Sequence, residues 1–492
     1  MKNYLILLGM AFCMTQGHAQ NLNGSDAKKA LDEFRRSVHS DLDNFRERCM
    51  AQFIEFVRNP WKEFEETKPV PIPEEEPVPP IVIPEEEKDK PIEDKPVVID
   101  DVVTPPPPVA PRPEPVEPIE EVPTVDEHYV TFTFFGIKAR VRFNLANKVT
   151  INGADHIAIA NALSRYTQEA FDNMLIDCLS LREEYHLCDW AYLQMLKSLS
   201  DKIHGRGTNE AALLLGFLYM QSGYQMRMGF NADKLYVLVG SNHRILEFGG
   251  YDVGGKMYYG VEDLPSNMYI CEAAYPNEKL MSLTIAESPI LPIDESPKKV
   301  VTSKQYSNME IEVSANKNLM AFYNTYPTSM IGENHMTRWA LYANTPLDPF
   351  MKDQIYPILN RELTSLSKYE AASRLLNLLQ TGLEYEYDDK VWGHDRAFFS
   401  EESLFYPYCD CEDRAILYTR LVRDLLDLDC ILVHYPGHLA SAVCFPTGDV
   451  KGDYIQLGGK KYIIADPTYI GAPIGKTMPD MDNKTASVIL LE

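Results

Sequence analysis

Apolar residues recur at steps of three or four along several stretches of the chain and alternate with polar residues along others. The first regular stretch runs from Leu31 to Phe53, where charged residues of both signs fill the positions between the apolar ones. This spacing predicts an amphipathic helix. Because the polar face carries both charge signs, we expect the helix to pack on a protein surface and not on a membrane.

Beyond residue 127 the pattern switches between strands and helices. The run YVTFTFFGIKARVRFN alternates apolar and polar positions and predicts a pair of strands. Helical spacing follows over 158–181 and 190–203, and again from Asn209, ahead of the strand-like run KLYVLVG. Residues 263–345 contain short β-like runs and prolines and predict a small β unit. Helical spacing returns over 352–383.

The C-terminal pattern predicts a helix followed by three strands. Residues 411–427 carry a broad apolar stripe at helical spacing, which predicts a helix buried in a domain core, with Asp410 as its N-cap. The run DCILVHYPGHLASAVCF then predicts two strands joined by a Pro-Gly turn, with His438 opening the second strand. A third strand, KKYIIA, leads to Asp466 before a Pro-Thr turn.

A proline-rich acidic segment precedes these elements. Residues 68–126 hold eighteen of the 34 prolines and sixteen acids against five bases. This composition predicts an extended linker with polyproline character, which holds the C-terminal body away from whatever the N-terminal helix docks on. The chain is expected to be an α+β protein divided into a signal peptide (1–19), an amphipathic helical segment (20–67), the linker (68–126), an α+β domain (127–262), the small β unit (263–345) and a C-terminal domain (346–492).

Charge and the N-terminal residues narrow the class of protein. The formal net charge is -25, and nothing resembles the clustered Lys and Arg that nucleic-acid phosphates require, so we expect no nucleic-acid partner. The first nineteen residues combine Lys2, a short apolar stretch and a small-residue cleavage site, which is typical of a secretory signal. No segment is apolar for long enough to cross a bilayer. We therefore expect an exported protein, periplasmic or associated with the cell envelope, whose N-terminal helix docks on an envelope partner; a lipoprotein modified at Cys13 is the alternative.

Cysteine usage does not define a metal or disulfide framework. Eight cysteines remain after removal of the signal peptide, spread over a long chain, and their pairing cannot be read from their spacing. The sequence contains neither a CxxC pair nor HExxH, so no metal site and no cofactor are predicted.

One cysteine stands where its thiol could be reactive. Cys411 falls in the first turn of the predicted helix, where unpaired backbone N–H groups and the helix dipole favour a thiolate. The neighbouring acids Asp410, Glu412 and Asp413 oppose this by repulsion, so activation requires a cationic partner. His438 could supply that partner and act as the base, and Asp466 could orient the ring.

The order DCEDRAIL, GHLASAV and YIIADPTY resembles the transglutaminase-like superfamily. The resemblance implies a papain-like core with the Cys-bearing helix packed on an antiparallel sheet, and Cys411, His438 and Asp466 as nucleophile, base and orienting acid. It also implies cysteine-dependent hydrolysis of amide bonds in a protein or peptide, as a peptidase or amidase. The longer text is similar to exported proteins of Bacteroidetes. A protein-cross-linking transglutaminase and a catalytically inactive binding or scaffold protein of the envelope are the alternatives.

Further residues carry competing interpretations. The run beginning at Asn209 aligns with the run at Cys411, which indicates a second, degenerate copy without the thiol; a chance match of two helix–strand units is the alternative. The backbone N–H of Cys411, with Tyr408 or a residue of FFSEESLF, could stabilise the oxyanion. We expect His434 to be packed rather than to act as the base, and His394 and His243 to be structural. Glu412 and Asp413 are expected to cap the helix or to pair with Arg414 and Arg420, and Cys409 could form a strained disulfide with Cys411.

Overall fold

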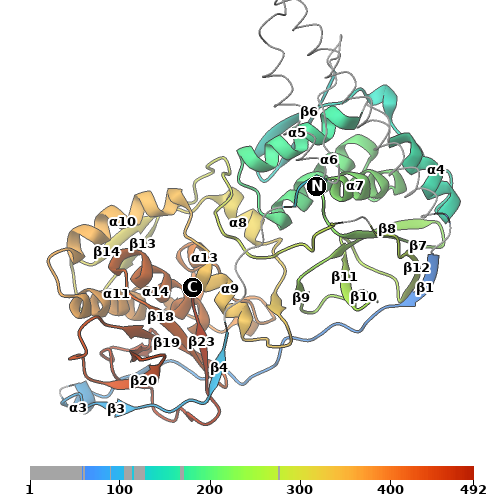
Figure 1. Ribbon diagram of the computed structural model, residues 1–492. Helices are drawn as coiled ribbons and strands as arrows, with labels where there is room; N and C mark the ends of the chain where they lie inside the picture. Colours follow the sequence, from blue (N-terminus) through green and yellow to red (C-terminus); the bar gives the residue numbers. More distant parts are fainter. Residues whose placement is uncertain are drawn as a thin grey trace, which may run out of the picture.

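The computed structural model describes residues 58, 61–88, 90–104, 113–115, 128–166, 171–274 and 277–492. Within them the protein is a mixed α+β structure with two large sheets (Figure 1). The expected signal peptide and nearly all of the amphipathic segment lie outside the described residues. The end of that segment was predicted wrongly, because Trp61–Glu65 form a strand, β1, at the edge of the first sheet. None of the helices in the described part combines the length and the apolar composition that a bilayer crossing requires.

The first half of the chain forms a helical layer on a sheet. The strand pair predicted after residue 127 is confirmed as an antiparallel hairpin. The helices and the strand KLYVLVG are also found. The elements are β5 (Tyr129–Phe134), β6 (Ile137–Arg142), α4 (His156–Tyr166), α5 (Asp172–Glu184), α6 (Asp189–His204), α7 (Asn209–Gln221), β7 (Met226–Asn231), β8 (Lys234–Gly240), β10 (Gly250–Val253) and β11 (Lys256–Gly260).

The expected small β unit over 263–345 is not a separate unit. Its first strand, β12 (Asn267–Cys271), lies between β1 and β7 in the first sheet, and β15 (Ser329–Ile331) pairs with β9 (His243–Ile245). The segment also contains two helices that its prolines and short apolar runs did not predict, α8 (Lys317–Tyr323) and α9 (Thr337–Asn344), beside the hairpin β13 (Lys299–Thr302) and β14 (Glu310–Val313). The boundary expected at 262 therefore cuts through a sheet.

The second half repeats the plan of helices on a sheet. Its elements are α10 (Pro349–Leu363), α11 (Lys368–Gly382), β16 (Glu384–Tyr385), α12 (Asp388–Val391), α13 (Ser400–Phe405), β17 (Tyr408–Cys409), α14 (Cys411–Leu426), β18 (Cys430–Tyr435), β19 (His438–Cys444), β20 (Asp453–Leu457), β21 (Lys460–Ala465), β22 (Tyr469–Ile470) and β23 (Ser487–Leu490). The helix and three strands predicted here are confirmed.

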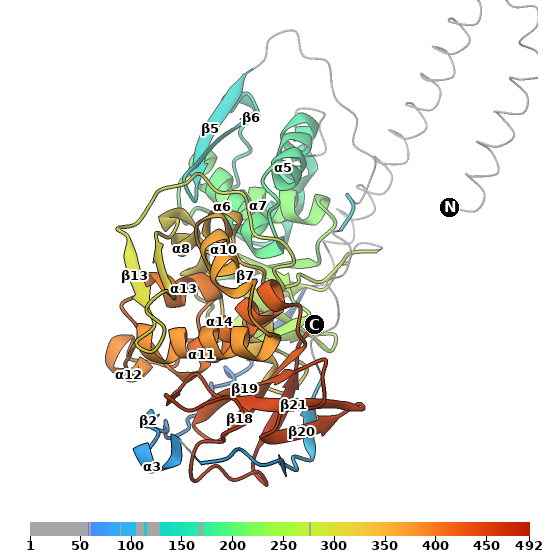
Figure 2. The ribbon, with the colours of Figure 1, turned by 90° about the vertical axis from the view of Figure 1, so that its left-hand side faces the viewer.

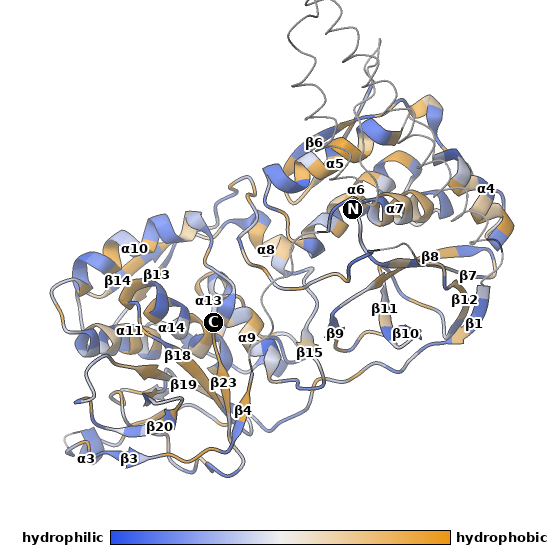
Figure 3. Ribbon diagram, viewed as in Figure 1, coloured by the Kyte–Doolittle hydropathy of each residue, from blue (hydrophilic) through white to orange (hydrophobic). Residues whose placement is uncertain are grey.

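The second sheet is buried on both faces. Residues such as Leu432 and Leu439 face α14, in one core cluster, whereas their neighbours Ile431 and Ala440 belong to a cluster on the opposite face. Figure 2 shows α14 and α11 lying along one side of this sheet. Double burial explains why β18 is apolar almost throughout, as the hydropathy colours in Figure 3 show. The helix carrying Cys411 is thereby fixed against a rigid support.

The segment expected as a spacer instead packs on the protein. We call residues 66–104 the strap; residue 89 within it is not described. It contributes β2 (Ile81–Val82), α3 (Glu85–Lys88), β3 (Lys95–Pro96) and β4 (Asp101–Val103), and β3 and β4 form the two edges of the second sheet. Three of its apolar residues, Ile83, Val97 and Val103, are buried, whereas Val82 and Val98 are exposed. Apart from α3, the described residues of 68–104 are extended, as their prolines predicted, but they pack on the protein and do not form a free spacer; most of the remaining expected linker, 105–126, lies outside the described residues.

The two large sheets share one strand order. The five strands of the first sheet that follow α7 lie in the order β12-β7-β8-β11-β10, and the five strands of the second sheet that follow α14 lie in the order β23-β18-β19-β21-β20. Numbered along the chain within each half, both orders read 5-1-2-4-3. The turns between the first two strands also match, since Asn231 pairs with Lys234 and Tyr435 pairs with His438 across two-residue connections.

Candidate active site

The start of α14 fixes the position of the Cys411 thiol. Cys411 is the first residue of the helix and Asp410 is its N-cap, as predicted. The buried Asp413 carboxylate holds this start in place, because it accepts hydrogen bonds from the backbone N–H groups of Asp410 (3.1 Å) and Phe398 (2.8 Å). The cysteine therefore sits at a helix N-terminus whose backbone is tied to the preceding loop.

His438 and Asp466 form a buried pair. His438 opens β19 and Asp466 follows β21, and His438 Nε2 lies 2.9 Å from Asp466 Oδ2. The backbone N–H groups of Thr468 (2.8 Å) and Tyr469 (3.2 Å) donate to the other carboxylate oxygen and fix its orientation. An Asp carboxylate facing Nε2 favours the tautomer with the proton on that nitrogen. Nδ1 is then the basic nitrogen, and within the described residues it is buried without a hydrogen-bond partner.

Gln380 on α11 fastens the loop that follows Asp466. Its side-chain nitrogen lies within 3.1 Å of the backbone carbonyls of Asp466, Tyr469 and Ala472, and its oxygen accepts from the N–H of Gly471. The side chain is buried. Gln380 is thus a positioning residue for Asp466, and sequence analysis did not identify it because its partners lie about ninety residues away.

Replacing Gln380 with leucine should therefore lower stability. The near-isosteric apolar side chain leaves several buried backbone groups without partners, and each such group costs about 1–3 kcal/mol. We expect the free energy of unfolding, measured by urea denaturation, to fall by roughly 2–4 kcal/mol. The exposed residue Glu384 provides a control, since Glu384→Gln should leave the midpoint within experimental error. An unchanged midpoint for Gln380→Leu would contradict the assigned contacts.

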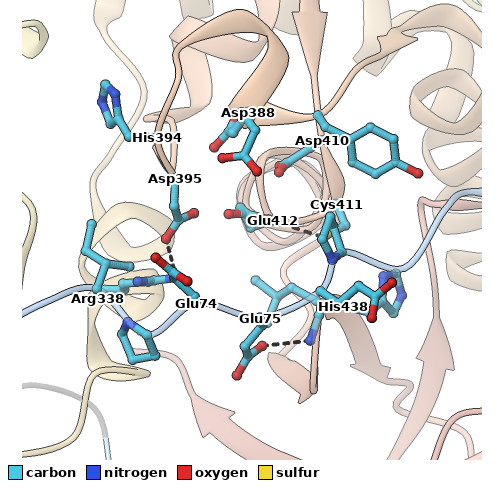
Figure 4. Close-up of a pocket in the computed structure, with 18 of the residues that line it drawn as sticks. Glu74, Glu75, Arg338, Asp388, His394, Asp395, Asp410, Cys411, Glu412 and His438 are labelled. Atoms are coloured by element: carbon cyan, nitrogen blue, oxygen red, sulfur yellow. Dashed lines mark hydrogen bonds and ion pairs between the residues drawn. The ribbon is translucent and has the colours of Figure 1, made fainter.

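The thiol itself is held in its protonated form. Cys411 Sγ donates to Glu412 Oε2 at 3.1 Å (Figure 4). Burial, followed by the charges of Glu412 and Asp410, raises the pKa of Cys411 well above its usual value, and a backbone hydrogen bond from Leu439 offsets this only in part. The repulsion expected from the neighbouring acids is therefore present, and the thiol must leave Glu412 before it can give its proton to His438.

Cys411 and His438 open onto one cavity of about 790 Å³. Three strap residues, Glu74, Glu75 and Glu76, and several acids of the C-terminal half also line it. In Figure 4 the carboxylates of Asp388, Asp410 and Glu412 surround a common space beside Cys411. The cavity wall is strongly acidic.

Three carboxylates in this wall lie very close together. The oxygens of Asp388, Asp395 and Glu412 lie within 4.8 Å of one another. Burial and the Glu412 charge raise the pKa of Asp388 to about 8 and that of Asp395 to about 7. Sequence analysis missed both aspartates. Asp388 begins the short helix α12 and Asp395 lies in the loop that follows it, and only the acidic runs EYDD and HD pointed to them.

The residues considered as alternatives to the Cys411, His438 and Asp466 site make structural contacts. His434 is buried, bonded to Glu75 (2.9 Å) and stacked on Trp339, as expected for a packed histidine. Of the two roles expected for Glu412 and Asp413, capping of the helix is confirmed for Asp413, and pairing with Arg414 and Arg420 is wrong. Arg414 donates to the Leu383 carbonyl (2.8 Å), and Arg420 bonds Asp424.

The cysteines near the site are not paired. All cysteines in the described part of the chain are free thiols, so the strained Cys409–Cys411 disulfide is not formed, and Cys409 donates to the Glu384 carbonyl instead. Tyr408, a candidate oxyanion donor, is 44% exposed. The role of the Cys411 backbone N–H as an oxyanion donor stays a prediction.

The strap crosses the turn that precedes His438. Glu75 accepts hydrogen bonds from the Gly437 N–H (2.7 Å) and His434 Nε2, and the Val78 N–H donates to the Gly437 carbonyl (2.9 Å). Gly437 has φ +76°, and a Cβ there would lie 2.0 Å from the Glu76 carbonyl oxygen. The turn and the strap therefore fit only with glycine at this position.

Replacing Glu75 with alanine should loosen this turn. The variant loses the charged acceptor for the Gly437 N–H, so amide exchange at Gly437, followed by hydrogen–deuterium exchange, should accelerate roughly tenfold. Glu76→Ala is the matched control, because no described hydrogen bond uses the Glu76 side chain. Equal exchange in the two variants would contradict a role of Glu75 in holding the turn.

The first half has other residues at the three corresponding positions. Asn209 begins α7 as Cys411 begins α14, and its Oδ1 accepts from Leu235 N, the second residue of β8, as Cys411 accepts from Leu439. Lys234 opens β8 and pairs with Glu262 (2.8 Å), 28 residues on, the same separation as between His438 and Asp466. The first half thus places Asn, Lys and Glu where the second places Cys, His and Asp.

No family model, no curated protein and no solved structure matches the chain.

Proposed function

We propose that the protein is a cysteine hydrolase, a peptidase or amidase with a transglutaminase-like, papain-like C-terminal domain. The observation that carries the proposal is the buried His438–Asp466 pair, which faces the same cavity as a thiol at the N-terminus of a buried helix. This combination supplies a nucleophile, a base and a group that orients the base. Export to the periplasm or cell envelope, from the signal-like N-terminus, is part of the proposal.

The proposed reaction has two halves. Cys411 turns away from Glu412 and gives its proton to His438 Nδ1 while Sγ attacks the amide carbonyl carbon. The backbone N–H of Cys411 stabilises the oxyanion, the C–N bond breaks, and His438 returns the proton to the leaving amine. Water then attacks the thioester and His438 accepts its proton; the C–S bond breaks, the carboxylic acid is released, and His438 returns the proton to Sγ. Asp466 orients the ring throughout.

The first half of the chain has no part in this chemistry under the proposal. Its shared strand order and the matched contacts of Asn209 and Lys234 support the interpretation that it is a degenerate copy of the same unit. An amide side chain cannot act as the nucleophile, and a lysine paired with Glu262 does not replace the imidazole. We therefore assign it a bracing role.

A second candidate is a catalytically inactive binding protein. The observations that favour it are the thiol held by Glu412 and the strap lying along the cavity. In that case the cavity binds an envelope partner without turnover, and the site residues serve only the fold. Protein cross-linking is the third alternative, in which an amine replaces water in the second half of the reaction.

The test uses the full chain and a mixed peptide library derived from a protein digest. New peptide termini, identified by mass spectrometry, should appear with the wild-type protein. Termini labelled from ¹⁸O water indicate hydrolysis, whereas amine incorporation indicates cross-linking. Absence of both, with Cys411 unreactive toward alkylating reagents, would favour the binding protein.

A further inference from the structure

The acidic wall of the cavity contains a carboxylate oxygen without a partner. Asp410 is 8% exposed, and its Oδ1 is buried with no hydrogen-bond partner in the described part of the chain. The Asp410 carboxylate lies within 4.8 Å of the donor atoms of Cys411 and Glu412, and in Figure 4 it points into the space between Asp388 and Glu412. A buried unpaired acceptor is costly, so this space is built for a group that donates hydrogen bonds.

The surrounding cations do not neutralise the wall. Arg338 bonds Asp395 (2.8 Å), but the Arg396 guanidinium bonds Glu402 and the Arg414 guanidinium bonds backbone carbonyls. The backbone N–H of Arg396 donates to Asp388 (2.6 Å), but within the described residues no guanidinium or lysine ammonium group forms an ion pair with Asp388, Asp410 or Glu412. Their mutual repulsion favours a bound cation.

We propose that Asp388, Asp410 and Glu412 bind the free α-ammonium group of a peptide substrate, so that the enzyme releases the N-terminal residue. This inference rests on the proposed function. An α-nitrogen lies about 2.5 Å from the carbonyl carbon of its own residue. Glu412 Oε2 lies 3.1 Å from Cys411 Sγ. An ammonium group bonded to Glu412 thus brings the carbonyl of the first residue nearer to the sulfur than that of any later residue.

A divalent cation is the competing occupant of the same carboxylates, since an all-oxygen ligand set suits calcium. An ammonium group and a metal ion at this site would impose different requirements on the substrate. An ammonium site discriminates between a free and an acetylated N-terminus. A metal site makes the reaction depend on added calcium and does not require a free amine.

The experiment compares two reagents that alkylate Cys411 of the full chain, phenylalanyl chloromethyl ketone and its N-acetylated form. In each case Sγ forms a bond to the methylene carbon and chloride leaves. Labelling rates at Cys411 are read by mass spectrometry and divided by the rate with iodoacetamide, which has no amine to recognise. Rates are measured in EDTA and with added calcium chloride.

We expect the free-amine reagent to label roughly tenfold to hundredfold faster than its acetylated form, in EDTA as well as with calcium. Asp388→Asn should reduce this ratio toward one, with each rate normalised to the iodoacetamide rate of the same variant. Asp389→Asn, at an exposed acid next in sequence, should keep the ratio.

Three results would overturn the inference. Equal rates for the two reagents, with iodoacetamide labelling that depends on His438, would overturn the ammonium site and leave the proposed hydrolase standing. A preference for the amine that disappears with calcium would assign the carboxylates to the metal. Failure of all three reagents to label Cys411 would overturn the proposed function and, with it, the inference.

Discussion

Replacing Cys411 with alanine should abolish amide hydrolysis. Removing the nucleophile of a cysteine or serine hydrolase lowers the rate by roughly 10⁴-fold or more, since only binding and oxyanion stabilisation are left. We expect the peptide termini generated by the wild-type protein to disappear in this variant. The change removes only the sulfur atom of a buried side chain that lines the cavity, and circular dichroism should show an unchanged fold.

Cys409→Ala is the matched control for this loss. Cys409 is also a buried free thiol and lies two residues earlier, but its thiol contacts the Glu384 carbonyl and not the cavity. The control should retain hydrolysis within about twofold, since it lacks a role in the chemistry. Hydrolysis that survives in Cys411→Ala, or is lost equally in both variants, would show that the thiol of Cys411 is not the nucleophile.

Replacing Glu412 with glutamine should make the Cys411 thiol more reactive. Burial and the charge of Glu412 raise the pKa of this thiol, and the variant removes the charge but keeps the shape of the side chain. The pKa therefore falls, and more thiolate is present at neutral pH. We expect alkylation by iodoacetamide at pH 7 to accelerate roughly tenfold, the effect of about one pKa unit, and the pH at half-maximal rate to move down.

The control for Glu412→Gln is Asp389→Asn, which removes an equal charge from an exposed position. It should leave the alkylation profile of Cys411 nearly unchanged, because solvent screens exposed charges. A slower reaction or an upward shift in Glu412→Gln would mean that the Glu412 charge does not set the pKa of the thiol.

The parts of the site that local rules govern could be predicted from the sequence. Asp410 and Cys411 were placed at the start of a helix because an N-cap residue preceded a regular apolar stripe. His438 was placed at the opening of a strand because a Pro-Gly turn came just before it. Each of these signals lies within a few residues of the feature that it predicts.

The strap could not be predicted from composition. Prolines and acids indicated a solvated linker, yet Ile83, Val97 and Val103 are buried against the second sheet. The strap strands β3 and β4 pair with β20 and β23, whose residues lie more than three hundred positions further along the chain. Pairing at a sheet edge depends on tertiary contacts. The valines and isoleucines between the prolines were the only local sequence signal for it.

Sequence analysis predicted that acids lie beside the thiol, but it identified only some of them. Repulsion by Asp410 and Glu412 was expected because they flank Cys411 in sequence. Asp388 reaches the same cavity from the start of the short helix α12 and Asp395 from the loop after it, and Gln380 reaches the Asp466 loop from another helix. No periodic pattern marks such residues, so their roles come only from the fold.

The most direct test of the site is the rate at which iodoacetamide alkylates Cys411 at pH 7 in the wild-type protein and in His438→Ala, read by mass spectrometry. If His438 accepts the thiol proton, the His438→Ala variant should react at least roughly 10²-fold more slowly than the wild type. His394→Ala, which changes another histidine lining the cavity, should react at the wild-type rate. Equal rates in the wild type and in His438→Ala would contradict a working Cys411–His438 pair.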